Sequence, residues 1–205
     1  EVPRAIASLS DNRLAVLLRQ EVVILEAGGE SLQRLELPDG DVGTAMAAHC
    51  EGQWLTCGTE SGPLVVFDCE EKSKFALSDT AKAHDGPVQS LLFETDELRV
   101  WSCGNDGGVA VTHARGKLDI EDRAGRNGHE DAGVAIIGWF ADRAYSVGRD
   151  KVVKAWERNS RKRPQNATDG IGQAVALALA TKNNRPLIAV ATKSKTIRLF
   201  QLDAA

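Results

Sequence analysis

The feature that most constrains the fold of this chain is a unit of about 40 residues that recurs along the sequence. Its clearest copy runs from Gly128-His129 to Trp156. Sixteen residues separate His129 from Ser146, three separate Ser146 from Asp150, and five separate Asp150 from Trp156. Repeats of this length indicate stacked structural units, each of which buries its faces against its neighbours.

The apolar pattern inside each unit is typical of β-strands. Runs of about five to eight residues rich in Val, Ile, Leu and Ala alternate with turns of Gly, Asp, Asn and Ser. Residues 172–182 are the best helix candidate, but small and large residues alternate over 174–179, so the repeat register favours a strand. We expect strands such as 74–77, 134–140 and 174–180. The fourth strand of the fourth unit is poorly marked, and the fifth unit stops after its third strand.

The pattern divides the chain into five units within one domain. Their approximate bounds are residues 1–38, 39–82, 83–127, 128–170 and 171–205. Turn residues agree with this division, because Asn105-Asp106-Gly107-Gly108 falls between two expected strands and is typical of a hairpin turn. Residues 59–62 and 149–151 occupy the same place in their own units.

Composition sets limits on the function. The net charge of −4 and the pI near 5.6 disfavour a general nucleic-acid binder, which needs a basic field. No apolar run reaches the roughly 18–20 residues that span a bilayer, and the first residues carry no signal-peptide pattern. Met46 is the only methionine, so we interpret the chain as processed or as part of a longer polypeptide.

Four cysteines occur, at positions 50, 57, 69 and 103, and no two form a C-x-x-C pair. Buried free thiols that behave as small apolar residues are the favoured interpretation, with disulfides or zinc as the alternatives. Free thiols indicate a reducing compartment, so we expect an intracellular protein, cytoplasmic or nuclear.

The fourth unit resembles the WD-repeat β-propeller family. The resemblance implies a hydrogen-bonded tetrad of His129, Ser146, Asp150 and Trp156, in which Asp150 accepts from the imidazole and Ser146 links the imidazole to the indole. It also implies an all-β propeller of four-stranded antiparallel blades. A different antiparallel β-sandwich or barrel is the alternative fold.

The other units match the pattern less well. The third unit keeps His84, Ser102 and Asp106, with Thr112 where Trp is expected. In the second unit, Thr56 stands for the serine, Glu60 for the aspartate and Phe67 near the tryptophan place. In the fifth unit the places of Gly-His, Ser, Asp and Trp are taken by Gly172-Gln173, Val190, Ser194 and Phe200. The first unit has almost no polar signature. The family usually has seven blades. The five countable units therefore suggest a ring that lacks N-terminal blades, a ring completed by a partner, or an unusual five-bladed ring.

No catalytic motif stands out. Ser146, His129 and Asp150 imitate a Ser-His-Asp set, but a catalytic serine needs an exposed hydroxyl beside an oxyanion hole, and a tetrad serine is buried. We therefore expect no enzyme activity, no cofactor, no metal and no small-molecule substrate. The favoured function is a scaffold that binds other proteins within a multi-subunit complex, without a membrane role.

Two sets of residues are candidate partner contacts. In WD-repeat proteins, the residue before the tight-turn Asp often faces partners, which implies Thr59, Asn105, Arg149 and Lys193 here; their character would suit an acidic peptide. The second set is a basic cluster comprising Arg158, Arg161, Lys162 and Arg163. It supports the alternative function, a nucleic-acid-associated WD-repeat subunit.

Overall fold

The structure is a computed structural model. It describes the chain except for residues 10–11, 50–52, 72–73, 95–97, 116, 123–127, 141, 159–163, 169, 183–184 and 203–205. Its described residues form five antiparallel sheets, four with four strands and one with three. The predicted all-β fold of four-stranded antiparallel sheets is thereby confirmed. We call the sheets blades 1 to 5 in chain order.

Within each blade, consecutive strands pair as neighbours. Blade 1 comprises β1 (Ala5–Ser8), β2 (Leu14–Leu17), β3 (Glu21–Leu25) and β4 (Ser31–Glu36). A short 3-10 turn, η2 (Pro38–Gly40), leads to blade 2, which comprises β5 (Gly43–Ala48), β6 (Trp54–Thr59), β7 (Pro63–Glu71) and β8 (Lys74–Lys82). Blade 3 comprises β9 (Val88–Phe93), β10 (Arg99–Gly104), β11 (Val109–Arg115) and β12 (Lys117–Asp122). Blade 4 comprises β13 (Gly133–Phe140), β14 (Arg143–Gly148), β15 (Val153–Glu157) and β16 (Gln165–Thr168). Blade 5 comprises β17 (Ala174–Lys182), β18 (Arg185–Thr192) and β19 (Ile197–Gln201).

The strand prediction for residues 174–180 is confirmed by β17, and the three strands expected in the fifth unit are those of blade 5 in the part of the chain that the structure describes. The largest error is in β8, which continues to Lys82 and not to residue 77. Residues 78–82, among them the half-buried Asp79, give a weak apolar signal, but the Asp79 carboxylate accepts a hydrogen bond from the Leu118 amide of blade 3 at 2.6 Å. A contact to the next blade thus extends a strand that hydrophobicity alone leaves short.

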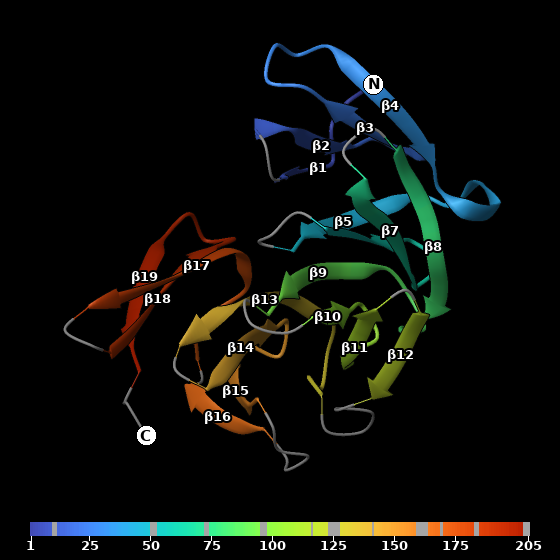
Figure 1. The fold of residues 1–205 in the computed structure, drawn as a ribbon. Helices are drawn as coiled ribbons and strands as arrows, with labels where there is room; N and C mark the ends of the chain where they lie inside the picture. The colour runs from blue at the N-terminus through green and yellow to red at the C-terminus, as the bar shows by residue number, and fades with distance from the viewer. Residues whose placement is uncertain are drawn as a thin grey trace.

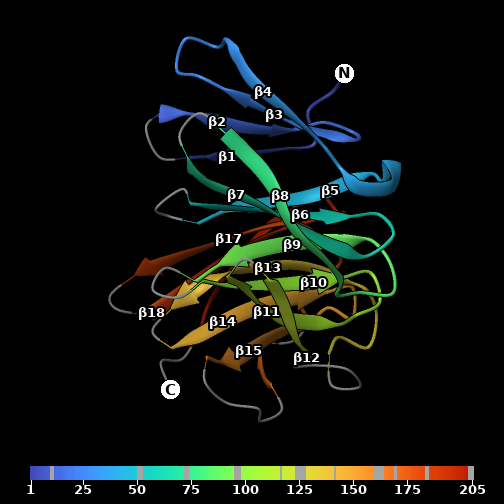
Figure 2. The same cartoon turned by 45° about the vertical axis from the view of Figure 1, so that its right-hand side comes forward.

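The blades follow one another around an arc (Figures 1 and 2). The first strands of successive blades contact each other, β1 with β5, β5 with β9, β9 with β13, and β13 with β17. Figure 1 shows blade 1 (blue) and blade 5 (red) apart from each other, at the two ends of the arc. The described residues therefore form an open array of propeller-type blades.

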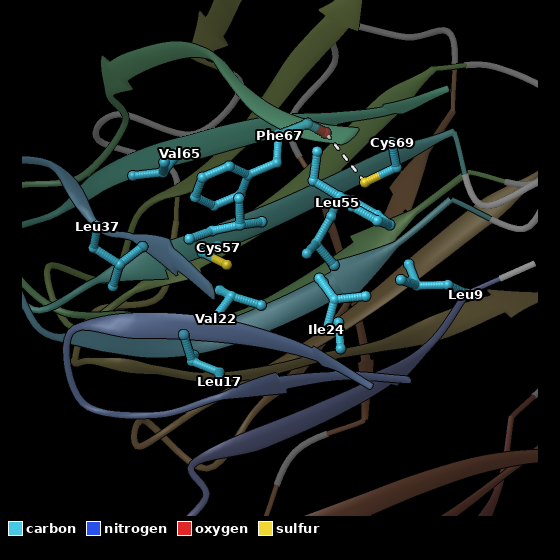
Figure 3. Close-up of a cluster of buried hydrophobic side chains, with 13 residues drawn as sticks. Leu9, Leu17, Val22, Ile24, Leu37, Leu55, Cys57, Val65, Phe67 and Cys69 are labelled. Atoms are coloured by element: carbon cyan, nitrogen blue, oxygen red, sulfur yellow. Dashed lines mark hydrogen bonds between the residues drawn. The ribbon is translucent and has the colours of Figure 1, made fainter. Parts of the chain in front are cut away.

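The core lies between the blades because alternate residues of each strand point to opposite neighbours. Figure 3 shows the layer between blades 1 and 2, where Leu17, Val22 and Ile24 of blade 1 meet Leu55 and Phe67 of blade 2. Three further buried clusters join blades 2 and 3, blades 3 and 4, and blades 4 and 5. Each blade is thus held chiefly by its neighbours.

The two ends of the arc expose apolar side chains. On blade 5, Ile197 and Leu199 are 76% and 65% exposed, and on blade 1 Ile6 is 63% exposed. These side chains point away from the buried clusters that the same strands form with blades 4 and 2. In the part of the chain that the structure describes, no helix is long and apolar enough to cross a membrane.

Candidate functional site

The structure brings His129, Ser146, Asp150 and Trp156 together inside blade 4, and we call these four residues the tetrad. The Trp156 indole Nε1 donates to the Ser146 hydroxyl at 2.7 Å. His129 Nε2 lies 2.8 Å from the same hydroxyl, and His129 Nδ1 lies 3.0 Å from Asp150 Oδ2. A neutral imidazole that carries its proton on Nδ1 satisfies every contact, because the serine then donates to Nε2.

Burial sets the charge state of this imidazole. Desolvation lowers the pKa of His129 below its ordinary value of 6.5, and the Asp150 carboxylate offsets this only in part. His129 is therefore neutral at pH 7. The Ser146 hydroxyl is fully buried and lies between the indole and the imidazole, so it cannot reach a substrate. The chemistry of the tetrad is that of a structural hydrogen-bonded chain.

The tetrad also fixes the backbone around it. The Asp150 carboxylate accepts from the amides of Glu130 and Val152 at 3.1 and 3.3 Å. The amide of His129 donates to the carbonyl of Gly107 in blade 3 at 2.8 Å. The side chains and the backbone together tie the turn of blade 4 to its own entry loop and to the blade before it.

Blade 3 contains the same set without the indole. His84 Nε2 lies 2.8 Å from the Ser102 hydroxyl, and His84 Nδ1 lies 3.1 Å from Asp106. Burial raises the pKa of Asp106, but hydrogen bonds from the amides of Asp85 and Gly108 and the contact with His84 outweigh it, so the pKa is lowered. Thr112 stands where blade 4 has Trp156, and its buried hydroxyl has no hydrogen-bond partner among the described residues.

Backbone contacts fix the register of the four tight turns between the second and third strands of blades 2 to 5. In each turn, one amide donates to the loop that enters the same blade: Glu60 to Val42, Asn105 to Pro87, Arg149 to Ala132 and Lys193 to Gln173. The residue two positions later always has a left-handed φ, at Gly62, Gly107, Lys151 and Lys195. Glu60, and not Thr59, therefore corresponds to Asn105, Arg149 and Lys193.

This register corrects the expectation for Thr59. Its side chain is fully buried and donates to the Pro63 carbonyl at 3.1 Å, so it cannot contact a partner. The alignment was wrong by one residue because the Thr56 hydroxyl imitates the Ser of the pattern, whereas Cys57 occupies the place of Ser146. Glu60, Asn105, Arg149 and Lys193 are all exposed.

Blade 2 replaces the tetrad with apolar side chains. Leu37 takes the place of His129, because its amide makes the matching bond to the preceding turn, at Gln20. Cys57 takes the place of Ser146, and Phe67 the place of Trp156. All three are buried in the cluster between blades 1 and 2 (Figure 3).

Blade 5 makes the same replacement with other residues. The amide of Ile171 bonds to the Lys151 carbonyl at 3.3 Å, so Ile171, and not Gln173, occupies the place of the histidine. Val190 and Phe200 stand at the places of Ser146 and Trp156, and both pack with Ile171 in the cluster between blades 4 and 5. Ser194 stands at the place of Asp150.

A second polar cluster lies on blade 3 and was not expected from the sequence. The Glu94 carboxylate, 1% exposed, accepts from the Trp101 indole at 2.6 Å and from Arg99 at 2.8 Å. Arg158 of blade 4 donates to the same carboxylate at 2.9 Å. Two cations, one indole and one buried carboxylate thus connect blades 3 and 4.

The structure places Arg158 in this cluster, where its Nε donates to Glu94 and its side chain is 18% exposed. Arg158 therefore has an internal partner, and its contact with an external one stays a prediction. Arg161, Lys162 and Arg163 lie outside the described residues. The structure describes one residue of the basic cluster, Arg158, so it gives the nucleic-acid alternative no support.

The described cysteines are buried free thiols. Burial raises the pKa of Cys57 and raises that of Cys69 to about 12, so both are protonated at neutral pH. Cys50 lies outside the described residues. Among the described residues, no group of three His, Cys, Asp or Glu side chains could hold a metal ion.

Comparisons with known proteins agree with the fold. The crystal structures of two computationally designed proteins, Ika8 and Ika4, match with TM-scores of 0.72 and 0.62 at 23% and 20% identity. The matches cover 95% and 80% of this chain, and 57% and 92% of the designed proteins. They show the likeness of the fold alone.

In sequence, the chain is similar to the target of rapamycin complex subunit wat1 of Schizosaccharomyces pombe, with 35% identity over 66 residues. The match covers 32% of this chain and 20% of that protein, so the chain spans about a fifth of the length of its relative. No family model matches the sequence.

Proposed function

We propose that this chain is a WD-repeat module that acts as a non-catalytic scaffold, holding other proteins together within a multi-protein assembly. The observation that carries the proposal is the exposed face formed by the tight turns. Each turn from blade 2 to blade 5 is fixed by a backbone hydrogen bond to its entry loop, and each presents a different side chain at the same place.

Rigid turns are well suited to recognition because little conformational entropy is lost when a partner binds. Glu60, Asn105, Arg149 and Lys193 form a row of acidic, neutral polar and basic side chains along the arc. Such a row can recognise a partner by its pattern of charge. The sequence similarity to a subunit of a target of rapamycin complex supports a place in an assembly of this general kind.

The buried polar residues favour a scaffold over an enzyme. The Ser146 hydroxyl is occupied by Trp156 and His129, and blades 2 and 5 fill the corresponding places with apolar groups. A set that can be exchanged for leucine, isoleucine and phenylalanine in neighbouring blades serves packing, which leaves the surface to perform the function.

The test is affinity purification of the tagged protein from the cells that make it, with native mass measurement of the recovered assembly. We expect stoichiometric partner proteins with the wild type, and an about tenfold lower recovery after Asn105→Ala, Arg149→Ala and Lys193→Ala are combined. Glu26→Ala with Glu30→Ala, exposed at the turn between β3 and β4, is the matched control and should leave recovery unchanged. Recovery of the wild type as a free chain would refute the proposal.

A further inference from the structure

The turn face changes its charge along the arc, and its basic end lies on blades 4 and 5. Two adjacent turns there carry four exposed cations: Arg149 and Lys151 on blade 4, Lys193 and Lys195 on blade 5. We call these four residues the basic turn pair. The chain as a whole has a net charge of −4, so this surface opposes the overall balance.

The two turns of the basic turn pair are close together. The carbonyl of Lys151 accepts from the amide of Ile171, and the carbonyl of Gln173, two residues further on, accepts from the amide of Lys193. Two residues span at most about 7 Å, so both turns border the same short loop. That loop, residues 170–173, contains no carboxylate. The Arg198 guanidinium donates to the carbonyl of Gly170, its first residue, at 3.3 Å.

The backbone gives a second, independent indication. Lys151 and Lys195 have φ angles of 67° and 60°, in the left-handed region where side chains other than glycine are strained. The matching residues of blades 2 and 3 are Gly62 and Gly107, where an added Cβ would lie 2.0 and 2.4 Å from the carbonyl oxygens of His84 and His129. Glycine would be the unstrained choice in blades 4 and 5 as well. The chain instead places an ammonium group there, on both blades.

We infer that the basic turn pair binds an acidic segment of a partner protein, rich in Asp and Glu. The inference rests on the proposed scaffold function, of which it names the ligand. An acidic peptide fits better than nucleic acid because Glu130 and Asp131 are exposed on the entry loop of blade 4, whose Ala132 carbonyl binds the Arg149 amide. These carboxylates would repel a continuous phosphate backbone, whereas a peptide can place its charges on one side of them.

The test uses the full chain and a fluorescent peptide of about ten residues in which Glu and Gly alternate. Fluorescence anisotropy at about 50 mM salt measures the affinity. In Lys151→Gly with Lys195→Gly, two surface ion pairs are lost, so we expect affinity to fall about five- to tenfold. The melting temperature should stay the same or rise, because glycine relieves the left-handed strain. Loss of binding without loss of stability separates recognition from folding.

Lys74→Ala with Lys117→Ala is the matched control, since it removes two exposed cations from the outer strands β8 and β12. It should change the affinity less than about twofold. Equal losses in the two variants, or no loss in the glycine variant, would overturn the inference. Tighter binding of a single-stranded oligonucleotide of equal charge, weakened by the same glycine changes, would also overturn it.

The scaffold function can survive the failure of this inference. If the glycine variant loses affinity for the acidic peptide no more than the control does, yet the combined Asn105, Arg149 and Lys193 variant fails to enter the native assembly, the inference fails while the scaffold function stands.

Discussion

Blades 4 and 5 solve one packing problem in two ways. Blade 4 fills the space beside its neighbour with a hydrogen-bonded chain from Trp156 through Ser146 and His129 to Asp150. Blade 5 fills the matching space with Phe200, Val190 and Ile171. The backbone contacts that tie each blade to the turn before it are the same in both. The same positions in the sheet can therefore be filled by hydrogen-bonded polar side chains or by apolar ones, while the backbone contacts stay the same.

In blades 4 and 5, the buried places of the histidine, serine and tryptophan are either all polar or all apolar. A polar group that is buried beside an apolar partner loses its hydrogen bond and costs about 1–3 kcal/mol, whereas a fully apolar set costs little. The four changes His129→Ile, Ser146→Val, Asp150→Ser and Trp156→Phe would give blade 4 the residues of blade 5. We call this combination the blade 5 variant.

The largest effect is expected for Trp156→Ala. The side chain is 3% exposed and packs with Trp101 of blade 3, so its loss leaves a cavity and should lower the free energy of unfolding by about 3–5 kcal/mol. Trp156→Phe should cost less, because Phe200 and Phe67 serve at this place in other blades. Urea unfolding measures both. An unchanged midpoint for Trp156→Ala would contradict the burial of the indole.

Glu94→Gln should come next, with a loss of about 3 kcal/mol in the free energy of unfolding. The change removes the negative charge that faces Arg99 and Arg158, and it spares the shape of the side chain. The control is Glu157→Gln, because Glu157 is a half-exposed carboxylate near Arg143. This change should lower the free energy of unfolding by less than about 0.5 kcal/mol. Equal costs for the two changes would show that the buried cluster does not stabilise the contact between blades 3 and 4.

Acid should weaken blade 4 through His129. Its pKa in the folded chain lies below the unfolded value of 6.5, so the unfolded chain takes up the proton first as the pH falls. The stability that neutral His129 contributes is complete above about pH 6.5 and declines as the pH falls below it. The free energy of unfolding, measured at about pH 7 and about pH 5, should therefore drop more for the wild type than for the blade 5 variant. Equal drops would mean that the folded and unfolded states bind this proton alike.

The smallest effect is expected in blade 3, where the apolar replacement is incomplete. Thr112→Val removes a buried hydroxyl that has no hydrogen-bond partner among the described residues and keeps the shape of the side chain. The free energy of unfolding should stay unchanged or rise by up to about 1 kcal/mol. Ser102→Val is the contrasting variant. It removes a hydroxyl that contacts His84, so it should be destabilising. A loss of stability in Thr112→Val would show that this hydroxyl is satisfied.

The sequence predicts polar blades better than apolar ones. His129, Ser146, Asp150 and Trp156 are recognisable because buried polar groups of these types at fixed spacing need one another. Leu37, Cys57 and Phe67 form an equivalent set, yet leucine and phenylalanine occur in every core, so nothing in the sequence distinguishes them. The one-residue error in blade 2 followed from this, because Thr56 was the nearest hydroxyl to the expected place.

Contacts between residues that are far apart along the chain could not be predicted from the sequence either. Arg158 stands beside other cations in the chain and was interpreted as a surface residue, but its partner Glu94 lies 64 residues away. Pairing across blades depends on how the sheets are placed side by side, which no local pattern encodes. The exposed positions of Asn105, Arg149 and Lys193 could be predicted because these residues directly precede Asp106, Asp150 and Ser194 in the repeat.

The most direct measurement is the free energy of unfolding of the blade 5 variant, compared with the sum of losses in its four single changes. If the tetrad is a structural unit that an apolar set can replace, the single changes each orphan a partner and the combination does not. The combined loss should then be smaller than the sum by at least about 2 kcal/mol. A combined loss equal to the sum, or a variant that fails to fold, would contradict the account.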